Sequence, residues 1–406
     1  MKYDAVIVGA GPAGSTAAKI VAERGFSVLV LEKETLNREK PCGGAITQRV
    51  VEYFKIPQKA FARKSTGIFL CSPKNRIAVI EKHTKNIRLM MRSVFDKILC
   101  EMAMDKGARF FEKSLVQEPL IKDGEVVGVK ARINGRTKTI EGRLMIGADG
   151  TPSTMASKLE LYSGKPKTLA YCFQYQMKLS NDLIEQRIGN NVEVYFGSEW
   201  IPFWYTWIIP KDNVVTVGTG TWIDVILERR INLKRQLDYF IKKHPIACRK
   251  LEGAKVMYSQ AHLIGLPGVL RDNVVNGCLI AGDASGTVSN VMGEGIWYSM
   301  KSGEAAGLSA AETLEKDDVS ARTLRARYDQ NLDQTVKDDL RLAFKIRMRF
   351  LNTDAQQQRS VVSVAKDKWW ADLVVRTIDG TSSYKKFIRQ TWSRPDKVLK
   401  TLLFHR

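Results

Sequence analysis

The chain has 406 residues, of which 44% are hydrophobic and 26% are charged, so it can bury a large core divided between two or more lobes. This balance excludes an intrinsically disordered protein. Six scattered cysteines without C-x-x-C spacing argue against a disulfide framework or a zinc site, so we expect no metal and a cytoplasmic location.

Positive charge is concentrated near the end of the chain. The formal net charge is +21, and residues 341–406 hold 15 Lys/Arg against 5 Asp/Glu. Such a region is typical of proteins that bind anionic membranes, and equally of basic proteins with no specific partner. No nucleic-acid-binding motif occurs, so we expect no nucleic-acid partner. No apolar run suits a signal peptide or a spanning helix, so any membrane contact should be peripheral, at the inner face.

The chain opens with a strand, a glycine loop, a helix and a second strand within residues 3–31. In the G-x-G-x-x-G loop, Gly9 permits the tight turn, Gly11 lets a pyrophosphate approach the backbone, and Gly14 lets helix and strand pack closely. The helix N-terminus offers free N–H groups and the positive end of its dipole to phosphates. Glu32 follows 18 residues after Gly14, where an acid accepts hydrogen bonds from a ribose diol. The segment therefore predicts dinucleotide binding.

Three later segments favour FAD over NAD. Arg92 opens a helix over residues 93–106, from which its side chain could reach flavin phosphates or ribityl oxygens. Two apolar strands end at Asp149 and at Asp283, each beside a glycine, and such carboxylates can accept from ribityl hydroxyls. The loop at residues 293–296 leads into a helix whose amides could face the pyrimidine carbonyl of a flavin. Each segment alone is ambiguous, and the ordered set is what indicates FAD.

The predicted fold class is α/β, or α+β overall, with a Rossmann-like FAD-binding domain, an antiparallel-sheet substrate domain and a helical C-terminal region. The FAD-binding domain is discontinuous and comprises residues 1–70, 85–160 and 270–310. Residues 161–269 alternate apolar and polar positions, which indicates a substrate-binding sheet that covers the flavin. Residues 311–406 are basic and mostly helical in pattern.

Two segments carry residues suited to a substrate site. The Pro-Cys-Gly-Gly turn at residues 41–44 has two residues without side chains, so it could lie close against a planar ligand, and Cys42 is its only titratable group. On a later strand, Tyr205, Trp207 and Ile209 share one face, which would form an apolar wall with one hydroxyl, suited to a long hydrocarbon. A well-packed sheet without a ligand would give the same pattern.

These motifs resemble those of a known family. The ordered flavin motifs, within residues 1–310, are similar to those of the FAD proteins that include para-hydroxybenzoate hydroxylase, flavin-dependent halogenases and geranylgeranyl reductases. The Pro-Cys-Gly-Gly turn and the segment Pro-x-x-Tyr-x-Trp-x-Ile-Pro resemble geranylgeranyl reductases, whose segment reads Pro-x-x-Tyr-x-Trp-x-Phe-Pro, and archaeal digeranylgeranylglycerophospholipid reductases in particular. Residues 380–384 are similar to a Gly-x-x-Ser-Tyr segment of that family.

The resemblance implies an FAD-dependent oxidoreductase that saturates isolated C=C bonds of geranylgeranyl chains, in archaeal-type membrane ether lipids. It implies a prenylated lipid substrate and an external electron donor, for which ferredoxin, NAD(P)H and a reduced quinone stay open. Ile209 in place of Phe and Asn290 in place of Pro depart from the family pattern, and the first brings the segment closer to the Trp-x-Trp-x-Ile-Pro of halogenases. A flavin-dependent monooxygenase or halogenase is therefore the alternative.

The motifs and the resemblance together imply a set of site residues. The expected cofactor-binding residues are Gly9, Gly11, Ala13, Gly14, Glu32, Lys33, Cys42, Gly43, Gly44, Arg92, Asp149, Gly150, Gly282, Asp283, Gly293, Gly295 and Ile296. Cys42 is a candidate proton donor or water-orienting group, although a turn residue that only packs on the flavin ring explains it equally. Tyr205 and Trp207 are the other catalytic candidates, because a hydroxyl can donate a proton or position substrate and aromatic faces favour cationic character at the alkene.

Overall fold

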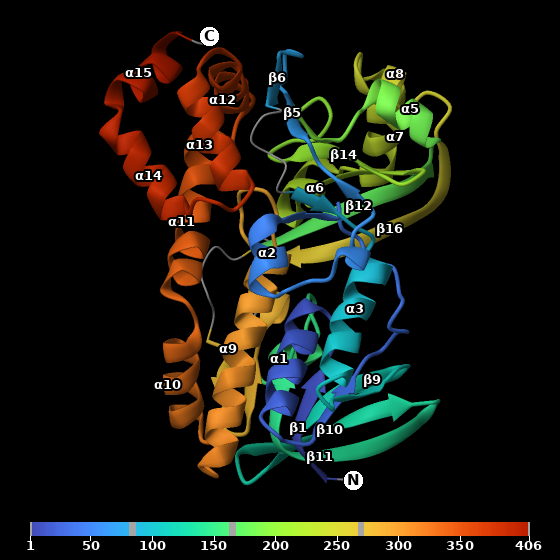
Figure 1. Ribbon diagram of the computed structural model, residues 1–406, viewed down its shortest axis with the longest axis vertical. Helices are drawn as coiled ribbons and strands as arrows, with labels where there is room; N and C mark the ends of the chain where they lie inside the picture. Colours follow the sequence, from blue (N-terminus) through green and yellow to red (C-terminus); the bar gives the residue numbers. More distant parts are fainter. Residues whose placement is uncertain (1, 81–86, 162–167, 267–271, 405–406) are drawn as a thin grey trace. The chain divides into compact units, whose positions relative to one another are not determined.

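The computed structural model describes residues 2–80, 87–161, 168–266 and 272–404 (Figure 1). The chain folds into two compact units, each assembled from three segments. Unit 1 comprises Met1–Glu39, Ser93–Thr168 and Ile264–Arg341, and unit 2 comprises Lys40–Arg92, Leu169–Leu263 and Leu342–Arg406.

Unit 1 is built on a parallel sheet extended by an antiparallel ribbon. Its parallel strands, in spatial order, are β8 (Arg109–Phe111), β2 (Val28–Leu31), β1 (Lys2–Val8), β11 (Arg136–Gly147) and β18 (Cys278–Ile280). The antiparallel additions are β10 (Glu125–Ile133) on β11, β9 (Ser114–Lys122) on β10, and β17 (Val274–Val275) on β18. The central strands are nearly continuous apolar runs, as expected for a parallel sheet that is covered on both faces.

Helices cover one face of this sheet, and the antiparallel ribbon with the short helix α4 covers the other (Figure 1). Successive side chains of β1 point to opposite faces of the sheet. Ala5 and Ile7 lie in the core on the helix side, whereas Val6 and Val8 lie in the core on the ribbon side. The helices of unit 1 are α1 (Pro12–Glu23), α3 (Arg92–Met104), α4 (Thr154–Lys158), α9 (Ile296–Glu315) and α10 (Ala321–Asn331). The predicted Rossmann-like domain is therefore confirmed in its architecture.

Unit 2 is built on a second sheet with mostly antiparallel pairing. In spatial order its strands are β16 (Lys255–Gly265), β12 (Leu169–Lys178), β15 (Val214–Trp222), β14 (Tyr205–Lys211), β13 (Asn191–Phe196), β5 (Gly67–Cys71) and β6 (Ile77–Ile80). Strands β13 and β5 are parallel, whereas the pairs β12–β15, β15–β14, β14–β13 and β5–β6 are antiparallel. A small separate sheet joins β3 (Ala45–Thr47), β7 (Ile87–Leu89) and β4 (Arg63–Lys64).

Unit 2 contains the short helices α2 (Gln48–Tyr53), α5 (Asn181–Arg187) and α6 (Ile223–Arg229), and its other helices fall into two groups. One group, α7 (Leu233–Lys243) and α8 (Ala247–Lys250), packs on the sheet face that carries Phe69, Tyr195 and Ile208. The other group confirms the predicted helical C-terminal region, with α11 (Gln334–Phe350), α12 (Asp354–Lys366), α13 (Lys368–Ile378), α14 (Tyr384–Ser393) and α15 (Pro395–Phe404).

The compact units differ from the predicted domain boundaries. The sequence assigns residues 40–70 to the FAD-binding domain, whereas they pack in unit 2, because β5 pairs with β13 of that sheet. The region predicted as one helical segment from residue 311 is also divided. Its first part, from the end of α9 through α10 to Arg341 in α11, belongs to unit 1, because α9 packs along α1 and α10 packs on α9. The predicted boundaries at residues 85 and 270 lie outside the described residues.

A buried histidine joins two helices of unit 2. His244 lies between α7 and α8, is fully buried, and its Nδ1 accepts hydrogen bonds from the backbone N–H groups of Ile246 and Ala247 at 3.2 and 3.3 Å. Its Nε2 lies 3.9 Å from the Sγ of Cys71. Burial lowers the pKa of His244 from 6.5 to about 4, so the folded protein keeps this ring neutral.

We expect His244 to make the protein less stable in mild acid. Its pKa is lower in the folded state than in the unfolded chain, so stability is lost as the pH falls from 6.5 towards about 4. Between about pH 7 and about pH 5 the loss in free energy of unfolding is about 2 kcal/mol. The variant His244→Asn offers an oxygen to the same N–H groups without titrating, so urea unfolding should show that loss reduced. An identical pH dependence in both proteins would contradict this assignment.

Candidate functional site

The structure gathers the predicted site residues into two groups, one in each unit. In unit 1 the three glycines of the first loop have different surroundings. A Cβ added at Gly9, whose φ is +100°, would lie 2.5 Å from the carbonyl oxygen of Ala148, and one at Gly14 would lie 1.9 Å from the carbonyl oxygen of Gly9. No atom lies within 4 Å of a Cβ added at Gly11. Gly9 and Gly14 are therefore required by packing, whereas Gly11 leaves the backbone open to a ligand at the start of α1.

Glu32 connects the end of β2 to the glycine loop. Its side chain is buried, with Oε2 accepting from the backbone N–H of Ala10 at 2.8 Å and Oε1 accepting from that of Glu34 at 3.0 Å. The guanidinium of Arg38 lies 3.6 Å from Oε1 and 3.2 Å from the buried carboxylate of Asp96. The loop that would bind the pyrophosphate therefore also holds Glu32, the acid that the sequence predicts to bind the adjoining ribose. Neighbouring Lys33 is exposed.

The acid at the end of β11 has a structural task. The Asp149 carboxylate accepts from the Ser153 hydroxyl at 2.6 Å and from the backbone N–H groups of Thr154 and Met155 at 2.7 and 3.1 Å, and so caps α4. Burial raises the pKa of Asp149, although these hydrogen bonds act to lower it. Gly150 follows with φ of +74°. A contact of Asp149 with ribityl hydroxyls stays a prediction, because both carboxylate oxygens already accept hydrogen bonds within the protein.

The second acid lies at the start of α9. Asp283 follows β18 in a short 3-10 turn, η3 (Gly282–Ser285), and its Oδ1 accepts from the Ser299 hydroxyl in the first turn of α9 at 2.8 Å. Gly282 has φ of +68°, and a Cβ there would lie 2.7 Å from the Cβ of Ala13 in α1. The Asp283 loop and the N-terminal ends of α1 and α9 therefore come together in unit 1. Ala13 contributes packing at this crossing.

Three further predicted cofactor-binding residues of unit 1 lie at the start of α9. Gly293 has φ of +64°, Gly295 is the N-cap residue of α9, and Ile296 is its first, buried residue. A Cβ at Gly295 would lie 3.5 Å from Oδ1 of Asp283. Arg92 belongs to unit 2 and is the buried first residue of α3, as the sequence predicts. Its contact with a cofactor stays a prediction.

In unit 2 the Pro-Cys-Gly-Gly turn lies on β14. A Cβ added at Gly43 would lie 2.7 Å from Cδ1 of Ile209, and one at Gly44, where φ is +82°, would lie 2.9 Å from Cε of Lys211. Gly43 therefore gives the turn room to lie on the strand, while the nearest atom to a Cβ at Gly44 is the carbonyl oxygen of Met90, at 2.2 Å. The close approach of this turn to a planar ligand stays a prediction. Cys42, which directly precedes Gly43, is half-buried.

The aromatic residues of β14 lie side by side on the strand. The rings of Tyr205 and Trp207 have centroids 5.9 Å apart, and the Trp207 ring occupies the space above Gly218, where a Cβ would lie 2.2 Å from Cζ2. The Nε1 of Trp207 is buried and has no hydrogen-bond partner among the described residues. Burial raises the pKa of Tyr205, so its hydroxyl holds its proton more tightly than usual. The prediction that Trp207 and Ile209 share a face is confirmed, because both lie next to Gly43.

Comparisons with known proteins identify the family of this chain. The sequence pattern of the FAD binding domain family matches residues 2–212, which is more than half of the chain. The chain is 27% identical over 401 residues to the digeranylgeranylglycerophospholipid reductase of Methanocaldococcus jannaschii, covering 98% of this chain and 97% of that protein. It is 31% identical over 350 residues to the chloroplastic geranylgeranyl diphosphate reductase of Nicotiana tabacum, covering 81% of this chain and 70% of that protein. The chain belongs to the geranylgeranyl reductase family. Its cofactor is FAD.

Solved structures share the fold of this geranylgeranyl reductase family member. The crystal structure of a geranylgeranyl bacteriochlorophyll reductase-like protein from Thermoplasma acidophilum has a TM-score of 0.82 and 22% identity, covering 97% of this chain and 99% of that chain. The flavin-dependent brominase Bmp2 has a TM-score of 0.72 and 18% identity, covering 98% of this chain and all of that chain. At these identities the likeness concerns the fold alone.

The family-like C-terminal segment is the start of a helix. Gly380 has φ of +79°, and a Cβ there would lie 2.6 Å from Nε of Arg49. The Ser383 side chain accepts from the backbone N–H of Lys386 at 3.2 Å and caps α14, whose first residue is the buried Tyr384. The segment of this geranylgeranyl reductase family member therefore serves the packing of α2 (Gln48–Tyr53), which carries Arg49, with the C-terminal helices.

Sequence reasoning missed two buried cations in unit 2. Lys211 is 1% exposed, and its place on β14 continues the alternation of Tyr205, Trp207 and Ile209, so the strand period was a signal that could have found it. Arg347 comes from α11, donates to the carbonyl oxygen of Phe203 and lies over the rings of Trp204 and Trp222 at 4.8 and 5.2 Å. Burial lowers its pKa to about 10. No local pattern marks Arg347, because its partners are far away in sequence.

The described part of the chain has neither a metal-binding cluster of side chains nor a membrane-spanning helix. Within residues 2–80, 87–161, 168–266 and 272–404, no group of three or more His, Cys, Asp or Glu side chains is placed to hold a metal ion. Over the same ranges, no helix combines the length and the apolar character needed to cross a bilayer.

Proposed function

We propose that the protein is an FAD-dependent reductase that saturates isolated C=C bonds of geranylgeranyl chains, with an archaeal-type membrane ether lipid as its substrate. The observation that carries this proposal is the thiol-bearing turn lying on an apolar aromatic strand, in a chain whose other unit has an open dinucleotide-binding loop. The relatives named as geranylgeranyl and digeranylgeranylglycerophospholipid reductases support it.

Unit 1 supplies a set of groups that fit FAD. The backbone at Gly11 and the N-terminus of α1 would hold the pyrophosphate, and Glu32 would hold the ribose. Asp283 and the N-terminus of α9 would hold the flavin end. Bound and reduced, FAD supplies the hydride that an alkene needs.

The residues of unit 2 would supply the proton and the dry surroundings. An isolated alkene is a poor hydride acceptor, so one carbon must gain a proton as the other gains the hydride. Because burial raises the pKa of Tyr205, we assign the proton to the half-buried thiol of Cys42, which regains it from water, and assign Tyr205 to positioning the chain. Trp207 lines the wall that would exclude water from the alkene carbon that gains cationic character.

An anaerobic experiment tests this function. The purified flavoprotein is reduced with dithionite, a geranylgeranyl-chain phospholipid is added, and flavin absorbance and lipid mass are followed together. Reoxidation of the flavin with a gain of about 2 mass units per double bond is the expected result. A flavin that stays reduced until air is admitted would overturn the proposal and favour the monooxygenase or halogenase alternative. Ferredoxin, NAD(P)H and a reduced quinone are then compared as the physiological donor.

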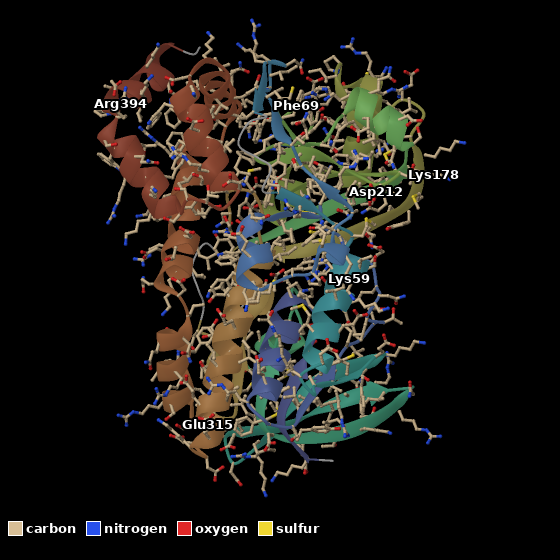
Figure 2. All side chains as sticks on the ribbon, viewed as in Figure 1. Lys59, Phe69, Lys178, Asp212, Glu315 and Arg394 are labelled. Carbon is tan, nitrogen blue, oxygen red and sulfur yellow. The ribbon has the colours of Figure 1, made fainter. Side chains whose placement is uncertain are left out.

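We further propose that α14 brings the enzyme to an anionic membrane. One exposed face of this helix carries Lys385, Lys386, Arg389 and Trp392, at the spacing of neighbouring helical turns, and Trp392 is 81% exposed. We call these four residues the basic aromatic face. Arg394, labelled in Figure 2, follows directly at the junction with α15. Cations beside an exposed indole suit the headgroup region of an anionic bilayer, where the lipid substrate resides.

Charge reversal on the basic aromatic face should weaken vesicle binding. Each Lys or Arg near an anionic surface contributes about 1 kcal/mol, so Lys386→Glu with Arg389→Glu should reduce partitioning at least about 30-fold. The measurement is co-sedimentation with vesicles containing phosphatidylglycerol, compared with neutral vesicles. Lys178→Glu with Lys255→Glu makes the same change in net charge at two exposed lysines on β12 and β16. Equal losses in both double variants would show that only total charge matters and would contradict a specific face.

A further inference from the structure

The contact between the Pro-Cys-Gly-Gly turn and β14 includes a buried ammonium. The Nζ of Lys211 donates to the carbonyl oxygen of Gly43 at 2.9 Å, although the lysine is only 1% exposed. Its stem lies against Gly44, where an added Cβ would be 2.9 Å from Cε. The residue directly after Cys42 is therefore fixed by a charge-assisted hydrogen bond.

A polar chain inside the sheet holds this ammonium in place. The Nζ of Lys211 also donates to the Thr216 hydroxyl on β15, and that hydroxyl donates to Oε1 of Gln176 on β12 at 2.7 Å. Thr216 is fully buried and Gln176 is 3% exposed. The chain of hydrogen bonds crosses three neighbouring strands and ends at the turn, so the sheet determines the position of the Gly43 carbonyl.

Burying a lysine in a sheet is costly, and an apolar side chain would fill the same space without that cost. The hydrogen bond from Lys211 to the Gly43 carbonyl points to a role for this lysine at the turn. We propose that Lys211 is a positioning residue that holds the turn on β14 and thereby fixes the place of the Cys42 thiol. This inference rests on the proposed function only for the consequence that a displaced thiol slows turnover.

The test uses the FAD-loaded enzyme and two substitutions. Lys211→Met keeps the length of the side chain and removes its donors, and Thr216→Val removes the hydroxyl that accepts from Lys211. The first readout is the alkylation rate of Cys42 by iodoacetamide, followed by peptide mass spectrometry. Cys248 is the internal reference, because it is the other partly exposed cysteine of the chain, while the remaining four are buried. Thr391→Val removes a buried hydroxyl from α14 of the same unit and is the matched control.

A hydrogen bond to a charged group contributes enough free energy to favour the turn held on β14 about tenfold over the released turn. We therefore expect Lys211→Met to change the Cys42 rate about tenfold and Thr216→Val to change it severalfold, with the Cys248 rate and FAD content unchanged. The second readout is turnover on the lipid: kcat should fall about tenfold in Lys211→Met, with KM little changed. Thr391→Val should alter neither the Cys42 rate nor kcat.

Two results would overturn the positioning role. One is a Cys42 rate and a kcat that stay as in the wild type in Lys211→Met. The other is a rise in both cysteine rates together with a lower unfolding midpoint, which would mean that the whole unit is loosened. If the enzyme reduced no prenyl lipid at all, the proposed function would fail, and the ratio of the two alkylation rates would still decide the role of Lys211.

Discussion

Replacing Gly14 with alanine should abolish FAD binding and destabilise unit 1, whereas replacing Gly11 with alanine should reduce FAD binding and leave the fold intact. A Cβ added at Gly14 would lie 1.9 Å from the backbone carbonyl oxygen of Gly9 and 3.3 Å from the Cβ of Ala148. Backbone atoms of a buried loop cannot give way by that much, so α1 must move off the sheet. We expect the free energy of unfolding to fall by at least about 3 kcal/mol.

Gly11 differs because the space that an added Cβ would occupy is open. Nothing lies within 4 Å of an added Cβ, and its φ of −76° suits any residue, so stability should change by no more than about 0.5 kcal/mol. The methyl group would point to the place proposed for the pyrophosphate, and FAD affinity should fall at least about tenfold. Urea unfolding of the apoproteins and FAD titration followed by fluorescence separate the two effects. Wild-type FAD affinity in Gly11→Ala would contradict the proposed cofactor position.

Replacing Cys42 with serine should lower kcat for lipid reduction at least about 100-fold, the usual contribution of a positioned general acid. Serine keeps the shape of the turn and its hydroxyl is a far weaker acid than a thiol, so FAD content, the flavin spectrum and KM should stay close to the wild type. Single-turnover reoxidation of reduced flavin under anaerobic conditions isolates the chemical step from re-reduction by a donor.

Cys248→Ser is the matched control for this substitution, because it changes the other partly exposed thiol of the chain. Its turnover should equal that of the wild type. If Cys42→Ser also turned over within about twofold of the wild type with full FAD, the thiol would be a packing residue of the turn and the proton would have to come from elsewhere.

Local patterns in the sequence were enough to indicate the cofactor unit and the family. The spacing of Gly9, Gly11 and Gly14 after an apolar strand has few structural meanings, and the short strand that follows ends at Leu31, directly before Glu32, as a βαβ unit requires. The alternation on β14 likewise predicted that Trp207 and Ile209 share a face. These predictions succeeded because each depends on residues that are close in sequence.

Contacts that the motifs do not specify, some local and some between distant segments, decided the rest. Asp149 has the expected place at a strand end, yet its carboxylate caps α4, because the hydrogen-bond donors that reach it come from the turn that follows. Residues 40–70 joined unit 2 because β5 found its partner in β13, more than a hundred residues later.

The sequence by itself therefore determined the cofactor, the family and the residue types of the candidate site. Only the tertiary structure decided which glycines have open space beside them and which have that space taken by a neighbour. The space beside Gly11 is open, whereas Ile209 of a strand far along the chain takes the space beside Gly43. The carbonyl oxygen of Met90 and the side chain of Lys211 take the space beside Gly44. Lys211 and Arg347 are surface residues by composition, and they are buried because the sheet and α11 enclose them with carbonyl, hydroxyl and aromatic partners. Such partners are assembled by long-range packing, which no short stretch of sequence specifies.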